Sequence, residues 1–158
     1  RLVEDQALIN RLGFNNLGSK NISARIRSNM PKGLLGINIG PNKDTKDRLN
    51  DYLIGYKTFH EIADYITINI SSPNTENLRS FHGDEKFKDL MKHIFTEKTK
   101  HKIKVPIVVK ISPDISDDQI SSISEILLEY KVSAIIVSNT TEGNRENLKN
   151  ILKLVKFC

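Results

Sequence analysis

The sequence has little of what several protein classes need. It contains a single cysteine, Cys158, so no disulfide can form within the chain, and a reducing compartment fits this composition. No apolar run approaches the ~20 residues that a helix needs to cross a bilayer, and no signal-peptide pattern is present. The G-x-G-x-x-G motif of dinucleotide-binding folds and the P-loop motif are also missing. These absences argue against a secreted disulfide-rich domain, a membrane span and two common nucleotide sites, and they favour a cytoplasmic location.

The charge balance is basic but not strongly so. The chain of 158 residues carries 24 Lys and Arg against 19 Asp and Glu, a net charge of +5. Much of the excess lies in residues 92–104, where five lysines face one glutamate. Such a stretch could bind nucleic acid or an anionic membrane. Aromatic residues are not interleaved with these lysines as in a single-strand binder, so we favour a solvated helix end and expect no nucleic-acid partner.

Strand-like and helix-like stretches alternate along the chain. β-branched and apolar runs predict strands over residues 33–40, 64–72, 105–112 and 133–141. Apolar residues at helical spacing predict helices over about 21–30, 44–63, 84–102, 117–130 and 146–155. Alternation at this spacing is typical of βαβ units and predicts an α/β fold with a parallel sheet.

Local signals fix several helix details. Asp44 or Thr45 is expected to cap the second helix, and Ser116 with Gln119 forms a capping-box pattern before the fourth. The inward faces are predicted from the apolar stripes Leu49, Leu53, Tyr56 and 59–62; Phe87, Leu90, Met91, Ile94 and Phe95; and Ile120, Ile123, Ile126 and Leu127.

The stretch 66–75 reads as a buried strand that ends in a polar loop. Pro73 cannot donate a ladder hydrogen bond, so the strand should stop just before it. The strand end and loop then carry five small uncharged polar side chains: Asn69, Ser71, Ser72, Asn74 and Thr75. Amides and hydroxyls without charge suit a planar polar ligand better than a metal ion or a phosphate. The alternative interpretation is an Asx-rich turn that closes the strand.

Each predicted strand carries a polar residue near its carboxyl end: Asn38, Asn69, Lys110 and Asn139. Parallel strands bring these ends to one edge, and buried polar groups need partners, so a ligand there would satisfy them together. Lys110 is the most informative, because a lysine in an apolar strand is costly unless it is paired or faces a ligand. The alternative is a lysine whose amine reaches the rim of the sheet.

Five motif blocks in this sequence match one family. They are Asp-Gln-Ala-Leu-Ile-Asn-Arg-Leu-Gly-Phe-Asn (5–15), Asn-Ile-Gly (38–40), Asn-Ile-Ser-Ser-Pro-Asn-Thr (69–75), Val-Lys-Ile-Ser-Pro-Asp (109–114) and Ser-Asn-Thr-Thr (138–141). Together they resemble class 2 dihydroorotate dehydrogenase, the quinone-linked flavoenzyme of pyrimidine biosynthesis, over about residues 1–145. Small departures are Leu12, Pro41 and Asn77, where the family commonly has Tyr or Met, Lys, and Gly. The resemblance implies a partial (β/α)8 TIM barrel of about four βα units.

The resemblance also implies roles for individual residues. FMN would be contacted by Asn10, Asn38, Asn69, Lys110 and Ser138. Dihydroorotate would be held by Asn10, Gly13, Phe14, Asn69, Asn74, Asn139 and Thr140. Ser72 would be the base that takes a proton from ring C5 while hydride leaves C6 for the flavin, and Thr75 would help to carry that proton onward through water. Quinone would accept the electrons, and no metal is implied.

Length sets a further expectation. A complete barrel takes about 250 residues, whereas this chain predicts four strands in one domain over residues 1–158. We therefore expect a fragment that lacks the glycine-rich FMN phosphate loops and is inactive alone. It would also lack the helices that make the full-length family peripheral on the inner membrane. The alternatives are a half-barrel completed by a partner chain or by self-association through open sheet edges, and a non-catalytic binding module that uses residues 92–104.

Overall fold

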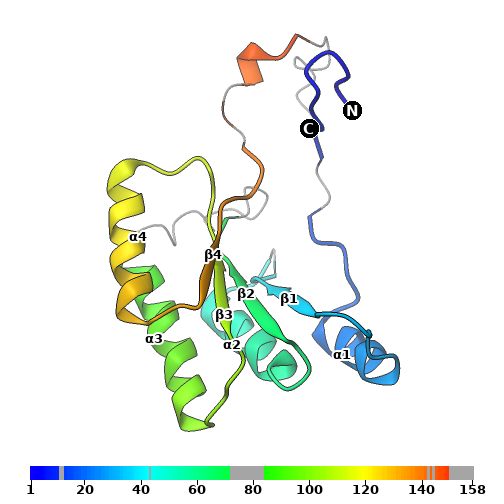
Figure 1. Ribbon diagram of the computed structural model, residues 1–158, viewed down its shortest axis with the longest axis vertical. Helices are drawn as coiled ribbons and strands as arrows, with labels where there is room; N and C mark the ends of the chain where they lie inside the picture. The colour runs from blue at the N-terminus through cyan, green and yellow to red at the C-terminus, as the bar shows by residue number, and fades with distance from the viewer. Residues whose placement is uncertain (11–12, 43, 72–83, 142, 144, 150–158) are drawn as a thin grey trace.

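A computed structural model describes residues 1–10, 13–42, 44–71, 84–141, 143 and 145–149. Its strands are β1 (Gly36–Ile39), β2 (Tyr65–Asn69), β3 (Ile107–Lys110) and β4 (Ala134–Ile136). They form one sheet in the order β1-β2-β3-β4, and every neighbouring pair is parallel (Figure 1). The predicted parallel sheet is therefore confirmed.

Helices precede or connect these strands. They are α1 (Ser19–Ser28), α2 (Arg48–Phe59), α3 (Asp84–Lys100) and α4 (Asp117–Glu129), followed by a short 3-10 helix, η2 (Arg145–Asn147). The α-helix predicted from residue 146 is wrong for the residues that the structure describes. A 3-10 helix covers 145–147, and Leu148 and Lys149 after it are not helical. The strands are also shorter than predicted, since the parallel ladder covers only three to five residues of each predicted run. No helix among the described residues is long and apolar enough to cross a bilayer.

Helix starts follow local hydrogen bonding. The cap of α2 is Asp47, whose side chain accepts a hydrogen bond from Asn50 N at 3.0 Å, so the predicted cap at Asp44 or Thr45 is wrong. Thr45 instead accepts from Asp47 N at 3.2 Å and shapes the approach to the helix. The predicted capping box of α4 is confirmed, with Ser116 and Gln119 exchanging hydrogen bonds.

The core lies between the sheet and helices α2, α3 and α4, which all lie on the same side of it (Figure 1). Alternate residues of β2 point into this layer, and Ile66, Ile68 and Ile70 are fully buried. The predicted apolar face of α3 is confirmed, since Phe87, Leu90, Met91 and Ile94 are fully buried. Ile120 was predicted to face inward but is 45% exposed: it lies in the first turn of α4, and the buried residues of that helix begin at Ile123.

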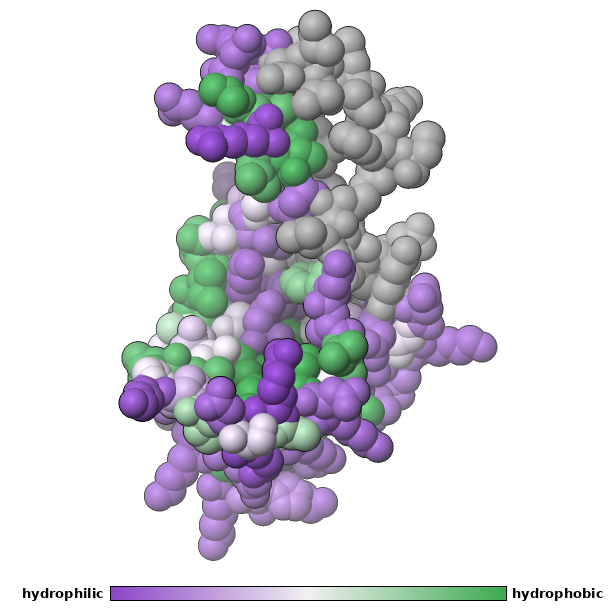
Figure 2. All heavy atoms as spheres, turned by 90° about the vertical axis from the view of Figure 1, so that its right-hand side faces the viewer, coloured by the Kyte–Doolittle hydropathy of each residue, from purple (hydrophilic) through white to green (hydrophobic). Residues whose placement is uncertain are grey.

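The other face of the sheet carries no described helix. The parallel register places these residues on it: Gly36, Asn38, Tyr65, Thr67, Asn69, Val108, Lys110, Ala134 and Ile136. The ring of Tyr65 lies over Gly36, where an added Cβ would meet Tyr65 Cζ at 2.1 Å. Glycine is therefore needed at that position for the ring to lie there. Seen from the side of α1, the surface shows apolar patches broken by hydrophilic side chains (Figure 2).

The first residues of the chain lie beyond the carboxyl ends of the strands, at the same end of the molecule as residues 145–149 (Figure 1). Leu2 and Ala7 form an antiparallel bridge that buries Leu2. Lys149 N donates to the Asp5 carboxylate at 2.7 Å and ties the two segments together. The segment with the first predicted site residues thus lies at the end of the sheet where the polar strand ends lie.

Candidate active site

The site begins with the register of the strands. Asn69 is the last residue of β2, and it is paired across the ladder with Lys110, the last residue of β3. Lys110 is in turn paired with Ile136 of β4. Because residues paired in register share a face, Asn69 and Lys110 both project from the face that no described helix covers. Lys110 is partly buried, and its amine forms no ion pair with any described residue.

Ser71 links the ends of β2 and β4. Its backbone N–H donates to Asn69 Oδ1 at 3.1 Å, and its hydroxyl donates to the same oxygen at 2.6 Å. Its carbonyl oxygen accepts from Asn139 Nδ2 at 3.1 Å. Ser71 is fully buried and Asn69 is 2% exposed, so these hydrogen bonds lie away from bulk water. They bring together asparagines that are 70 positions apart in the sequence.

Residues after β4 complete this group. Asn139 N donates to Ile111 O at 3.1 Å, which holds the segment after β4 beside the end of β3. The Ser138 hydroxyl donates to Asn139 O at 3.0 Å. We call Asn69, Ser71, Lys110, Ser138 and Asn139 the strand-end cluster. Four of its five members are predicted site residues, and the fifth, Ser71, belongs to the same predicted polar loop.

Tyr52 was not recognised from the sequence as part of the site. It lies on α2, is fully buried, and its hydroxyl donates to Asn69 O at 2.7 Å. Burial raises the pKa of Tyr52, partly opposed by the nearby Arg48, so the hydroxyl keeps its proton and stays a donor. The only sequence signal was an aromatic residue beside the predicted stripe of this helix.

The motif blocks 109–114 and 138–141 also meet in space. The Thr141 hydroxyl donates to Asp114 Oδ1 at 2.5 Å, and Gly143 N donates to Thr141 Oγ1 at 3.0 Å. Asp114 N donates to the hydroxyl of Ser112, which is 1% exposed. These contacts fix the loops after β3 and β4 against each other, next to the strand-end cluster.

The other predicted site residues lie elsewhere or outside the described residues. Ser72, Asn74 and Thr75 lie outside the described residues. Asn38 projects from the uncovered face of β1 and is exposed. Asn10 and Thr140, which lie outside the strands, are also exposed. Gly13 and Phe14 have positive φ angles of 64° and 59°, and Phe14 is 51% exposed. The structure therefore unites Asn69, Lys110, Ser138 and Asn139, and no hydrogen bond connects Gly13 or Phe14 to them.

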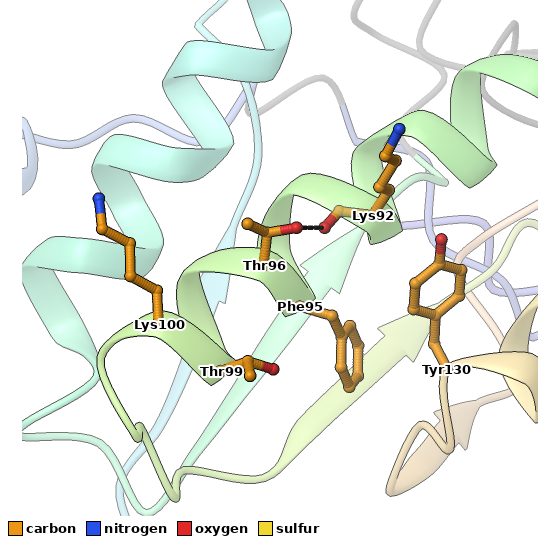
Figure 3. Close-up of a pocket in the computed structure, with 6 residues that line it drawn as sticks. All are labelled: Lys92, Phe95, Thr96, Thr99, Lys100 and Tyr130. Atoms are coloured by element: carbon orange, nitrogen blue, oxygen red, sulfur yellow. Dashed lines mark hydrogen bonds between the residues drawn. The ribbon is translucent and has the colours of Figure 1, made fainter.

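Some charged residues of the basic stretch 92–104 form contacts within the fold. Lys98 Nζ donates to Val105 O at 2.5 Å, and burial lowers the pKa of Lys98. Glu97 pairs with Lys57 at 3.0 Å and lies 3.5 Å from His101. Lys92 and Lys100 border a shallow hollow of about 450 Å³ between α3 and the end of α4 (Figure 3). It is lined by Lys92, Phe95, Thr96, Thr99, Lys100 and Tyr130.

That hollow is separate from the strand-end cluster. Its floor is the pair Phe95 and Tyr130, whose ring centroids are 5.3 Å apart (Figure 3). Phe95 lies on α3 and Tyr130 directly follows α4, both on the covered side of the sheet, whereas Asn69 and Lys110 project from the other side. The polar residues that the sequence singled out therefore belong to one face, and the lysines of the basic stretch to another.

The strand-end cluster combines uncharged polar groups with one cation. Lys110 supplies the cation, while Asn69, Ser138 and Asn139 supply uncharged donors and acceptors. No group of three or more His, Cys, Asp or Glu side chains in the described part of the chain could hold a metal ion.

Known proteins are similar to this chain along nearly its whole length. The family model for dihydroorotate dehydrogenase matches residues 1–156. A dihydroorotate dehydrogenase (quinone) of Vibrio atlanticus is 46% identical over 164 aligned positions, which cover 100% of this chain and 47% of that protein. The enzyme of the same name from Bartonella tribocorum is 42% identical, covering 95% of this chain and 42% of that protein. The chain thus spans less than half the length of these relatives.

Solved structures give the same result for the fold. The ligand-free DHODH of Eimeria tenella superimposes with a TM-score of 0.86 at 31% identity, covering 97% of this chain and 49% of that one. Its complex with ferulenol gives a TM-score of 0.84 over 97% and 48%. The four βα units are therefore part of a (β/α)8 barrel, as predicted. With a family model that matches nearly every residue, this chain belongs to the dihydroorotate dehydrogenase family.

Proposed function

We propose that this chain forms the part of a quinone-linked dihydroorotate dehydrogenase that holds the dihydroorotate ring against FMN. The observation that carries the proposal is the strand-end cluster, in which Asn69, Lys110 and Asn139 come from three neighbouring strands or their loops and meet at one edge. Active sites of (β/α)8 barrels lie at this edge, because the carboxyl ends of all strands surround it.

The residues divide between the two ligands on this proposal. Asn10, Asn38, Asn69, Lys110 and Ser138 would contact FMN. The dihydroorotate ring and its carboxylate would be held by Asn10, Gly13, Phe14, Asn69, Asn74, Asn139 and Thr140. When bound, FMN supplies the acceptor for the hydride of dihydroorotate. The cation of Lys110 would favour negative charge on the ring system beside it, since the partly buried amine has no described counter-ion.

The proton of dihydroorotate would leave through Ser72, with Thr75 next in the path. A serine hydroxyl is a weak base, so it needs a relay within hydrogen-bond reach. Asn69 and Ser71, which precede Ser72, are held from three sides by Tyr52, Asn139 and their own mutual hydrogen bonds. This support would orient the catalytic loop where it leaves β2.

A chimaera tests the proposal directly. Residues 1–145 would replace the matching segment of the Vibrio atlanticus relative, and the product would be assayed for FMN content and for dihydroorotate-dependent quinone reduction. We expect turnover in the chimaera, and at least a hundredfold loss of kcat in Ser72→Ala with FMN content unchanged. A chimaera that folds and retains FMN but does not oxidise dihydroorotate would contradict the proposal.

Association between copies needs its own measurement. The edge strands β1 and β4 have unpaired backbone groups along one side within the described sheet, and such edges can pair with another chain. The mass of the purified chain in solution, with and without FMN, would separate a monomer from a self-associated half-barrel. The expected cytoplasmic location and the use of quinone stay predictions.

A further inference from the structure

Both asparagines of the strand-end cluster have their amide orientation fixed by the main chain of one residue. A backbone N–H can only donate, so the Asn69 atom that faces Ser71 N at 3.1 Å must be Oδ1. A backbone carbonyl can only accept, so the Asn139 atom that faces Ser71 O at 3.1 Å must be Nδ2. Flipping either amide would place two donors or two acceptors against each other.

The fixed orientations leave opposite groups for a ligand. Asn69 Oδ1 accepts hydrogen bonds from both the N–H and the hydroxyl of Ser71, so Nδ2 remains as the donor of this side chain. Asn139 donates one N–H to Ser71 O, so its Oδ1 remains as an acceptor beside its second N–H. Neither remaining group has a hydrogen bond to any described residue. A ligand that meets Nδ2 of Asn69 and Oδ1 of Asn139 must therefore offer an acceptor to the first and a donor to the second.

We infer that Ser71 is a positioning residue: its main chain sets the donor and acceptor polarity of this site, and its hydroxyl holds the Asn69 amide in that orientation. The inference rests on the proposed function for its ligand, a ring with neighbouring carbonyl and N–H groups. The hydroxyl is the only part of the Ser71 side chain that takes part in these contacts, since the other two involve its main chain. At 2.6 Å from Asn69 Oδ1 it forms the shortest hydrogen bond in the cluster and holds the amide in one rotamer.

The first test needs no ligand. In the 15N-labelled chain, the side-chain amide protons of Asn69 and Asn139 would be followed by NMR for hydrogen exchange and for rotation about the C–N bond. Ser71→Ala keeps both backbone contacts and removes the hydroxyl. We expect exchange or rotation of the Asn69 amide to rise at least threefold, with a smaller change at Asn139.

Two further variants keep this test decisive. Ser71→Thr retains the hydroxyl and should restore the slow Asn69 amide, whereas Ser71→Cys retains the volume with a weak donor and should not. The matched control is Ser112→Ala, which deletes a hydroxyl of equal burial that contacts Asp114 N rather than an asparagine. An Asn69 amide that behaves alike in wild type, Ser71→Ala and Ser71→Cys would overturn the inference, as would an equal change in Ser112→Ala.

The second test uses orotate as the probe in the chimaera. Asn69→Asp still accepts from Ser71 but presents an acceptor where a donor stood, so orotate affinity should fall at least tenfold. Ser71→Ala should raise KM for dihydroorotate about threefold to tenfold, the loss expected for one neutral hydrogen bond, and Ser71→Thr should recover it. Absence of orotate binding in every variant would count against the proposed function and would leave the amide result standing.

Discussion

The Tyr52 hydroxyl donates to the backbone carbonyl of Asn69 at 2.7 Å, with both residues buried. One turn later on the same helix, Tyr56 is equally buried, yet its hydroxyl has no hydrogen-bond partner in the described structure. Burial, and secondarily the carboxylate of Glu97, raises the pKa of Tyr56 to about 12. The two tyrosines thus form a natural pair for measuring what the link to Asn69 contributes.

Replacing Tyr52 by phenylalanine should destabilise the fold, while the same change at Tyr56 should not. Tyr52→Phe leaves the Asn69 carbonyl short of a buried partner and should lower the free energy of unfolding by about 1–2 kcal/mol. Tyr56→Phe removes a hydroxyl that makes no hydrogen bond, so stability should stay level or rise. Urea denaturation followed by circular dichroism measures both variants, and equal losses would contradict the assigned role of Tyr52.

The cap of α2 offers a test of where that helix begins. Asp47→Ala removes the side chain that accepts from Asn50 N and should lower the free energy of unfolding by about 1 kcal/mol. Asp44→Ala, three positions earlier, should have almost no effect, because Asp44 caps nothing in the structure. Thermal denaturation of the two variants side by side decides the matter, and a larger loss in Asp44→Ala would place the cap where the sequence alone suggested.

Lys110 should matter for an anionic ligand far more than for the fold. Lys110→Met removes the cation beside Asn69, so FMN affinity in the chimaera should fall at least tenfold, with Lys110→Arg recovering part of it. Fluorescence titration of FMN provides the measurement. Lys100→Met is the matched control, because Lys100 borders the separate hollow between α3 and α4. Equal losses from both lysine variants would show that overall charge rather than position is responsible.

Acid stability should depend on Glu97. The hydrogen bond from Lys57 lowers the pKa of Glu97 below its ordinary value of 4.5 in the folded chain. A carboxyl group whose pKa is lower when folded stabilises the fold above its unfolded pKa, and that contribution disappears as the pH falls through the folded value. Glu97→Gln should therefore flatten the decline in stability below about pH 4.5.

Glu85→Gln provides the comparison for that pH series. Glu85 lies on the same helix, is exposed, and pairs with no basic group in the described part of the chain. Its removal should leave the acid limb of the stability curve as steep as in the wild type. Denaturation midpoints from pH 3 to pH 7 would reveal the difference, and identical curves for both variants would rule out a contribution from the Lys57 pair.

Most of the fold followed from the order of residues along the chain. Ile66, Ile68 and Ile70 alternate with polar residues, and that alternation predicted a strand with one face in the core. The spacing of Phe87, Leu90 and Met91 likewise predicted which face of α3 is buried. The strand-end positions of Asn69 and Lys110 were predictable for the same reason, because parallel strands must end at one edge.

Contacts between segments distant in the sequence were harder to predict. The bond from Tyr52 to Asn69 depends on how α2 is rotated on the sheet, and both Leu53 and Tyr52 were reasonable inward residues by periodicity. The role of Ser71 required knowing that the loop after β4 returns to its carbonyl oxygen. The sequence alone does not single out Asp47 as the cap, because Asp44 and Thr45 carry equally good capping side chains only a few positions away.

The pairing of Asn69 with Lys110 has a consequence for insertions and deletions. Removing a single residue from the interior of β3 would exchange the two sides of that strand, turning Val109 outward and driving a lysine ammonium toward the isoleucine layer. Loops between the elements can change length without this penalty. Length variation in this chain should therefore be confined to its connections, while each strand keeps a constant count of residues up to its polar end.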